Sequence, residues 1–534
     1  MEREAMFIRD NRFELLSRKT LKHDIVAGIT VGIVAIPLGM AFAIASGVKP
    51  EYGIYTTIIA GLLVALLGGS RFQIAGPTGA FIPILLGIVL QYGYEDLLIA
   101  GFMAGVFLLI MSFLKIGDLI HFVPRAVTVG FTAGIAVIIF AGQIANFLGL
   151  EGVEQQEFFH LDMMEIFRNI GTVNGFSILT AVIGLAVILV LTRFAPKVPA
   201  FLVALLIPTL IAYFFFPGQV ATIGTAYSGI PQKLPEFAFP HITFPKIVEL
   251  WQPALIIAAL GAIESLLSAV VADGMAGGSQ TKSNRELFGQ GIANMTVPLF
   301  GGIPATGAIA RTATNIRSGA ISPMSGVVQS VFVLLVLLLF APFASHVPLA
   351  SMAPILMFVA WNMSGIRPFV QIAEMRSGDS VVLWATFLLT VFVNLTVGVE
   401  VGFLLAVLMF LRKMSGKLNL KAKPANEDDY LYGNVEPGLT FTAVNVDGPL
   451  FFGTIQTFER EMEKLLDKKP DALILRLRGL TVLDAGGVAA MSEMLDKADR
   501  TGIRILLQNL PLEKRTLLRK SGLIEKIGER NIVK

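Results

Sequence analysis

The chain has 534 residues, of which 54% are hydrophobic and only 15% are charged. Soluble domains carry about a quarter charged residues, so this composition indicates a protein that crosses a membrane several times. The net charge of +3 is too small to predict a nucleic-acid partner, and the absence of cysteine excludes disulfides, thiolate chemistry and cysteine-ligated metals. The five histidines show no spacing typical of metal ligands.

Residues 1–23 are predicted to form a cytoplasmic N-terminal segment. They contain six basic residues, at positions 3, 9, 12, 18, 19 and 22. Lysine and arginine are enriched on the cytoplasmic side of membrane helices, so the N-terminus is expected there. The apolar run that follows lacks a small-residue cleavage pattern, which favours a retained first helix over a signal peptide.

A transmembrane region is predicted over 24–415, as two series of apolar segments in 24–216 and 251–413. Five basic residues between Arg412 and Lys423 mark a second cytoplasmic end. If both ends of this region lie in the cytoplasm, the chain must cross the membrane an even number of times. Seven segments in each of the two series satisfy this condition. Because seven is odd, the second series must run inverted relative to the first. The predicted segments lie near 24–46, 53–69, 77–91, 97–114, 124–147, 175–193, 199–216, 251–274, 286–300, 307–319, 324–341, 348–363, 379–396 and 398–413.

The chain changes character after about residue 420. Residues 416–436 are polar and predict a linker, whereas 437–534 alternate between strand and helix patterns and predict a small α/β domain. The elements predicted there are a hairpin turning at Asp447-Gly448, a helix over 455–468, a strand over 472–480, a helix from Ala485 to Thr501 ending at Gly502, a strand over 503–510 and a helix over 513–527.

Two interrupted stretches form the candidate functional site. GPTGAF at 76–81 is echoed by IPATGAI at 303–309. Irregular backbone at membrane depth is tolerated only where protein buries it or where it lines a wet cavity. Paired Gly/Pro interruptions in two halves of a chain are the best sequence indication of a transporter's binding site. The alternative is a pair of packing kinks that bind no ligand.

If a helix begins just after each interruption, two helix N-termini face each other inside the membrane. Each presents free N–H groups and a partial positive charge, which together favour an anion. The predicted donors are the backbone N–H groups of Thr78, Gly79, Ala80, Gly307, Ala308 and Ile309.

Arg311 lies within one turn of the second predicted helix start. An arginine inside the membrane is costly unless it faces a cavity or a partner, so Arg311 is predicted to attract the substrate anion. A structural pair with Glu264, or a reach to the membrane interface, is the alternative. Pro37 interrupts the first helix, and Met40 and Phe42 beyond it are predicted to line the substrate cavity.

Glu264 lies inside the apolar stretch LIIAALGAIESLLSAVV, one turn before Ser268, so the two side chains are expected on one helix face. Beside an anion site, a carboxylate would repel the substrate unless a proton or cation neutralised it. Glu264, Ser268 and Gly307 are therefore predicted to hold the coupling H⁺ or Na⁺. A salt bridge from Glu264 to Arg311 is the alternative. No other metal or cofactor is expected, and no catalytic motif predicts an enzyme.

The chain resembles the SulP anion permeases over nearly its whole length. The resemblance is carried by IVAGITVGIVAIPLGMAFAIASG, GPTGA, IESLLSAVVAD with NRELFGQGIANM, and ATGAIARTATNIRSGAISPMSGV, while LRLRGLTVLDAGGVAAM resembles a STAS domain. It implies an α-helical polytopic membrane protein of 14 segments as 7+7 inverted repeats, with core and gate domains as in UraA-like transporters. It also implies short strands before the third and tenth helices, substrate binding between those helix starts, elevator-type movement and a homodimer with STAS contacts.

Two positions depart from this resemblance. Leu38 stands where many sulfate-type members carry glutamine, so one expected polar contact is missing. Asp484 is followed by Ala485-Gly486-Gly487 and lacks the phosphorylatable serine of anti-sigma-antagonist STAS domains. Conversely, Glu264 with Ser268 is similar to the pattern of the sodium-coupled bicarbonate branch.

We therefore expect a secondary active transporter of a small anion, sulfate or bicarbonate foremost, coupled to H⁺ or Na⁺. We expect it in the bacterial inner membrane, with both termini in the cytoplasm. An uncoupled or exchange-type conductor of chloride or dicarboxylate is the alternative. A nucleobase transporter would need more polar side chains at the site, and a signalling module built on the STAS domain is weakened by the missing serine.

Overall fold

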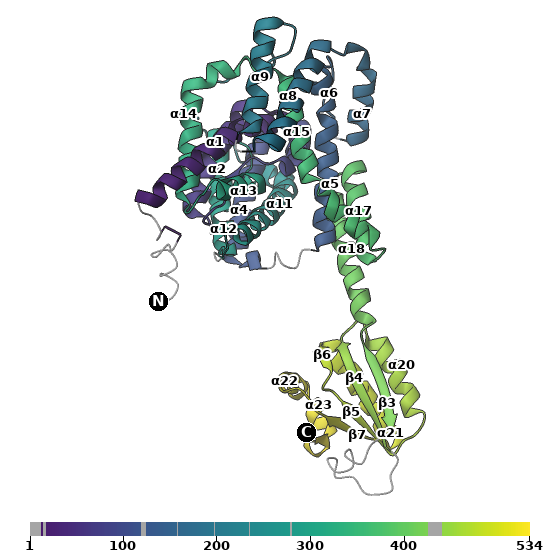
Figure 1. Ribbon diagram of the computed structural model, residues 1–534. Coiled ribbons are helices and arrows are strands. Elements are labelled where there is room, and N and C mark those ends of the chain that lie inside the picture. The colour runs from purple at the N-terminus through teal and green to yellow at the C-terminus, as the bar shows by residue number, and fades with distance from the viewer. Residues whose placement is uncertain are drawn as a thin grey trace. The chain divides into compact units, whose positions relative to one another are not determined.

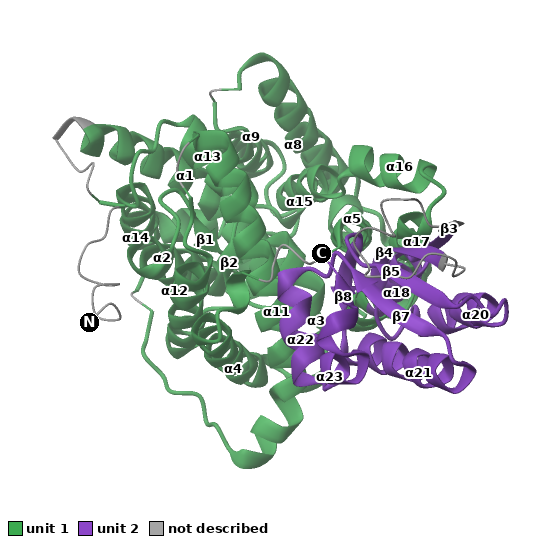
Figure 2. Ribbon diagram, turned by 90° about the horizontal axis from the view of Figure 1, so that it is seen from below, with its two compact units in different colours: residues 1–403 green, residues 404–534 purple. Residues whose placement is uncertain are grey.

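The computed structural model describes residues 12–13, 18–118, 124–156, 158–196, 198–233, 235–277, 280–424 and 441–533. The chain forms two compact units, residues 1–403 and 404–534, which Figure 2 draws in green and purple. Figure 1 labels their helices and strands. Most of the predicted N-terminal segment, residues 425–436 of the predicted linker and 437–440 of the predicted α/β domain lie outside the described residues.

The first unit is helical, and each predicted apolar segment corresponds to a helix. Three further α-helices in its described part were not expected: α7 (Phe159–Arg168), α10 (Ile223–Tyr227) and α16 (Ile366–Glu374). The short helix α6 (Ile144–Leu148) lies at the end of the predicted segment 124–147. The helices that match predicted segments are α1 (Arg18–Ala45), α2 (Pro50–Leu67), α3 (Ile82–Tyr92), α4 (Tyr94–Phe113), α5 (Arg125–Gly142), α8 (Gly175–Phe194), α9 (Ala200–Phe215), α11 (Phe244–Ala276), α12 (Ser283–Thr296), α13 (Ile309–Arg317), α14 (Met324–Ala344), α15 (Leu349–Met363), α17 (Gly378–Phe392) and α18 (Leu395–Ser415).

The helix lengths confirm a polytopic membrane protein. Nine helices among the described residues are long and apolar enough to cross a membrane, and three shorter apolar helices accompany them. A full crossing needs about 20 residues, so α3 with 11 residues and α13 with 9 reach only part of the way. The count of 14 crossings stays a prediction.

These two short helices begin at a two-stranded antiparallel sheet. β1 (Ala75–Gly76) pairs with β2 (Thr306–Gly307), so that Ala75 lies opposite Gly307 and Gly76 opposite Thr306. Both strands are buried. Their pairing satisfies backbone groups at a place where neither segment is helical, as a membrane interior requires. The strands expected before the third and tenth helices are thus confirmed.

The second unit contains a six-stranded sheet in the order β3-β4-β5-β7-β8, with β6 paired to β4. β3 is antiparallel to β4, and the other pairs are parallel. The elements are β3 (Asn419–Pro424), β4 (Phe441–Leu450), α20 (Ile455–Leu466), β5 (Ala472–Arg476), β6 (Leu480–Leu483), α21 (Ala485–Thr501), β7 (Arg504–Gln508), α22 (Leu512–Lys520), α23 (Leu523–Ile527) and β8 (Ile532–Val533).

Four sequence predictions for this unit are corrected. The strand predicted over 472–480 ends at Arg476 as β5, and the separate strand β6 begins at Leu480. The hairpin at Asp447-Gly448 is instead the single strand β4, because β3 on one side and β5 and β6 on the other hold it extended. β3 occupies part of the predicted linker. The last predicted helix is divided at Gly522, whose φ of 75° ends α22. By contrast, α21 has the predicted bounds and ends at Gly502 with φ 74°.

Candidate functional site

The first helix start of the site is the single 3₁₀ turn η1 (Gly79–Phe81), which leads into α3. Thr78 precedes it with an extended backbone. The first N–H groups of a helix have no partner within it, and those of Thr78, Gly79 and Ala80 make no hydrogen bond to another described residue. These three predicted donors are therefore available to a ligand.

Three helices surround this start. A Cβ atom built on Gly79 would lie 3.6 Å from Ile139 of α5, 3.6 Å from Met363 of α15 and 3.7 Å from Phe42 of α1. Apolar side chains on α1, α5 and α15 therefore wall the first start. Because α5 and α15 belong to neither interrupted segment, the site involves more of the unit than the two starts alone.

The second helix start, at α13, leaves fewer donors available. The Gly307 N–H donates to Ser265 Oγ at 3.0 Å, and the Ala308 N–H donates to Ile74 O at 2.8 Å. Both N–H groups have protein acceptors in this structure, and their donation to the anion stays a prediction. Ile309, whose side chain is 42% exposed, provides the first uncommitted N–H on this side.

Arg311 connects the two starts. Its side chain is 1% exposed, its Nη2 donates to Pro77 O at 3.1 Å, and its guanidinium lies 5.8 Å from the Phe42 ring centroid. Its Nη1 has no hydrogen-bond partner in the part of the chain that the structure describes. A Cβ atom on Gly76 would lie 2.5 Å from Nη1, so glycine at this position leaves room for the guanidinium.

Glu264 on α11 contacts the first start rather than Arg311. Its carboxylate accepts a hydrogen bond from Thr78 Oγ1 at 2.9 Å, and no ion pair between described residues joins it to Arg311. Ser268 is buried and donates to Thr312 Oγ1 at 3.3 Å. Glu264 and Ser268 thus have different partners, and their joint role in cation binding stays a prediction.

Ser265 is a site residue that the sequence reasoning missed. Its Oγ accepts the Gly307 N–H and lies 2.8 Å from Thr306 Oγ1, which also donates to Gly261 O. The sequence signal that could have identified Ser265 is its position directly after Glu264 in an apolar helix. Polar side chains inside a membrane usually have a partner across the helix interface, and Ser265 has two.

Met40 is a predicted site residue that the structure places elsewhere. It lines a small apolar cavity with Val333 and Leu337 of α14. Phe42 follows two residues later and points roughly 200° away around the helix. Of the two predicted wall residues on α1, Phe42 is therefore the one beside Arg311 and Gly79.

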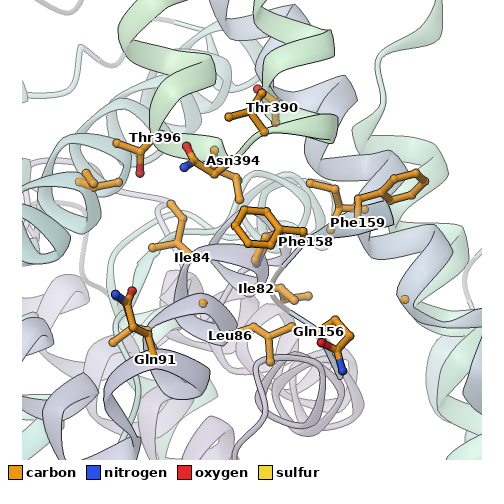
Figure 3. Close-up of a pocket in the computed structure, with 18 of the residues that line it drawn as sticks. Ile82, Ile84, Leu86, Gln91, Gln156, Phe158, Phe159, Thr390, Asn394 and Thr396 are labelled. Carbon is orange, nitrogen blue, oxygen red and sulfur yellow. The ribbon is translucent and has the colours of Figure 1, made fainter. Parts of the chain in front are cut away.

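A cavity of about 430 Å³ approaches the first start from α3, α5, α7, α11, α17 and α18 (Figure 3). Its lining includes Ile139, which also faces Gly79. No lysine, arginine or histidine occurs among the described residues that line it. Burial raises the pKa of Asp162, on α7 outside the predicted spans. The polar and acidic lining residues are Gln91, Gln143, Gln155, Gln156, Asp162, Glu249, Gln252, Thr390, Asn394, Thr396 and Glu400.

Both regions of the chain are similar to known proteins. A model of the Sulfate permease family matches residues 21–386, and a STAS domain model matches 434–534. YvdB of Bacillus subtilis (strain 168), a provisionally assigned sulfate transporter, is 53% identical over 97% of both chains. Bicarbonate transporter BicA of Picosynechococcus sp. is 28% identical over 90% of this chain and 87% of that protein. The murine Slc26a9 anion transporter in its inward-facing state shares the fold, with a TM-score of 0.84 at 17% identity, over 97% of this chain and 90% of that one.

Proposed function

The chain belongs to the sulfate permease family and carries a STAS domain, and from this membership we propose that it is a secondary active transporter of a small anion, not an enzyme. Sulfate and bicarbonate are the foremost substrates, since the relatives YvdB and BicA are named for them. The proposed site lies between η1 and the start of α13.

The observation that carries this proposal is the environment of Arg311. A guanidinium that is almost completely buried, with one nitrogen lacking a partner among the described residues, is unfavourable unless a ligand compensates it. An oxyanion would accept from Nη1 and from the N–H groups at Thr78, Gly79 and Ala80. Charge-assisted hydrogen bonds of this kind are stronger than neutral ones.

The walls of the site favour a small anion over a heterocycle. Phe42, Ile139 and Met363 around Gly79 offer contact area but no hydrogen-bonding groups that could read the edges of a nucleobase. Apolar walls also lower the local dielectric constant, which strengthens the attraction between the anion and Arg311.

The coupling cation is proposed to act at Glu264. Thr78 contributes its N–H to the proposed anion site and its hydroxyl to the Glu264 carboxylate. A negative Glu264 beside the anion would raise the free energy of binding, so H⁺ or Na⁺ at Glu264 would favour binding of the anion. Carboxylate oxygens can bind either H⁺ or Na⁺. Ser268 would have to turn from Thr312 to contribute a ligand, so Glu264 is the primary residue in this proposal.

We propose the transport mechanism, the oligomeric state and the orientation in the membrane on the basis of the same family membership. We propose that the β1–β2 pair and its two short helices move as one body, in an elevator-type mechanism. We also propose a homodimer with STAS contacts, in the inner membrane, with both termini cytoplasmic. The pairing of β1 with β2 supports the first point, because it joins both starts directly.

Counterflow in proteoliposomes tests the function. Labelled sulfate, bicarbonate, chloride and fumarate are each presented with Na⁺ and H⁺ gradients. We expect saturable uptake of sulfate or bicarbonate that depends on one of the two gradients. Uptake that is indifferent to both gradients would favour the exchange-type conductor, which uses the same site without Glu264. Absence of uptake for all four anions would contradict the proposal.

A further inference from the structure

α12 carries a row of buried polar side chains that the proposed transport mechanism does not use. Glu286, Gln290 and Asn294 are spaced four residues apart, so they share one face of the helix. They are 0%, 0% and 1% exposed. All three lie in NRELFGQGIANM, one of the stretches that carry the family resemblance, and the proposed transport mechanism gives it no role.

At one end of the row, Asn294 holds the second interrupted segment. Its Nδ2 donates to Ala305 O and its Oδ1 accepts the Ala305 N–H, both at 2.8 Å. One amide thus satisfies both backbone groups of the residue that precedes β2, as a neighbouring strand would.

At the other end, Glu286 holds residues 69–73, which lead into the first interrupted stretch. Its Oε2 accepts the N–H groups of Gly69 and Ser70 at 2.8 and 3.1 Å. Its Oε1 accepts the side-chain amides of Gln73 and Gln290 at 2.9 and 3.1 Å. Four donors therefore stabilise this buried carboxylate, and no salt bridge with a described residue does so.

Gln73 extends the contact from Glu286 to the proposed anion site. Its Nε2 also donates to Ser265 O at 3.0 Å, and Ser265 Oγ accepts the Gly307 N–H. A Cβ atom on Gly307 would overlap Gln73 Nε2, so the amide lies directly against β2. Glu286 thus fixes Gln73, and Gln73 fixes the distance between α11 and β2.

We propose that Glu286 is a positioning residue for the anion site. By fixing Gln73 it holds Ser265 and Gly307 in place, and so keeps Arg311 and the two helix starts within reach of one anion. The inference rests on the proposed function. The hydrogen bonds of the Glu286 carboxylate go to Gly69, Ser70, Gln73 and Gln290, and none of them goes to Arg311 or Glu264. Loss of Glu286 should therefore weaken anion binding and leave the cation dependence unchanged.

The absence of cysteine from the chain makes a single-cysteine test possible. Ile309→Cys places a reporter at the exposed start of α13. The full-length protein in proteoliposomes is labelled with a maleimide at increasing sulfate or bicarbonate, and the midpoint of protection measures binding. Glu286→Gln, which puts a donor against the Gly69 and Ser70 N–H groups, should raise the midpoint roughly tenfold or more, the effect typical of losing a supporting residue behind a binding site.

Two further variants keep the proposal testable. Glu374→Gln, at an exposed carboxylate on α16, should leave the midpoint unchanged. Gln73→Leu retains three of the four donors to Glu286 but removes the contact with Ser265, so it should raise the midpoint even if Glu286→Gln does not fold. An unchanged midpoint in either folded variant overturns the proposal.

The parent reporter separates this inference from the proposed function. If neither anion protects Ile309→Cys in the otherwise unaltered chain, the anion site itself is wrong. If protection occurs and either folded variant keeps the parent midpoint, the anion site stands and the proposed role of Glu286 does not. A changed cation dependence in Glu286→Gln would place this residue in coupling, which also contradicts a positioning role.

Discussion

The two helix starts are similar in sequence and different in what they offer a ligand. At the first start, Thr78, Gly79 and Ala80 keep their N–H groups free of other described residues. At the second, Gly307 and Ala308 have protein acceptors, and the start contributes a side chain, Arg311, instead. The duplicated motif therefore gives two different helix starts. The first offers free backbone N–H groups, and the second positions the guanidinium of Arg311.

The difference arises from how the second segment is held. Three alternate residues, Ile303, Ala305 and Gly307, each donate their N–H to a side-chain oxygen from a different helix. Alternate residues of an extended chain point the same way, so one edge of this segment is paired throughout by side chains. The acceptors are Thr56 on α2, Asn294 on α12 and Ser265 on α11.

The largest effect is expected from substitution of Arg311, the positively charged side chain at the second start. Arg311→Ala should lower anion uptake roughly 100-fold, within the range for truncating one partner of a buried charged contact. Arg311→Lys should recover only part of it, because an ammonium lacks the planar fork that serves Pro77 O and the ligand together. Initial uptake rates per folded transporter measure both. Uptake of Arg311→Ala at the parent rate would remove the arginine from the site.

Glu264→Gln tests the acid beside the first start. The amide oxygen can still accept from Thr78, but the side chain no longer carries a titratable charge. Uptake should lose its dependence on the H⁺ or Na⁺ gradient while anion exchange persists. The measurement compares gradient-driven uptake with counterflow in the same vesicles. A variant that still requires the parent's gradient would exclude Glu264 from coupling.

Gly76→Ala tests whether the first start accommodates Arg311 as the structure indicates. The added Cβ atom would lie 2.5 Å from Nη1 and displace the guanidinium. Anion affinity should fall about tenfold, as expected for a small misplacement in a preorganised site. Gly87→Ala on α3 is the matched control, since nothing lies within 4 Å of its Cβ atom. Equal affinities for the two variants would contradict this placement of Arg311.

The sequence predicts the helices and the two starts, but not how their donors are used. Apolar segments and Gly/Pro interruptions locate the helices and the two helix starts because both are local patterns, whereas the strands β1 and β2 are implied only by the family resemblance. The occupation of the Gly307 N–H depends on Ser265, on another helix, and on how that helix is rotated. Helix rotation also separates Met40 from Phe42. Tertiary pairing overrides the turn signal at Asp447-Gly448, because β4 has neighbours on both edges.

Two variants with smaller expected effects on transport, Ser265→Ala and Thr78→Val, compare the two starts most directly. Ser265→Ala removes the acceptor of the buried Gly307 N–H and the partner of Thr306 Oγ1, so it should lower stability by about 1–3 kcal/mol and leave the cation dependence intact. Thr78→Val removes the hydroxyl that donates to Glu264 but keeps the backbone N–H, so it should change the cation dependence, which Ser265→Ala should not. Thermal melting in detergent and uptake against cation concentration give the two readouts. If Ser265→Ala also changes the cation dependence, or if Thr78→Val leaves it unchanged, the contrast between the two starts that is drawn from their hydrogen bonds is wrong.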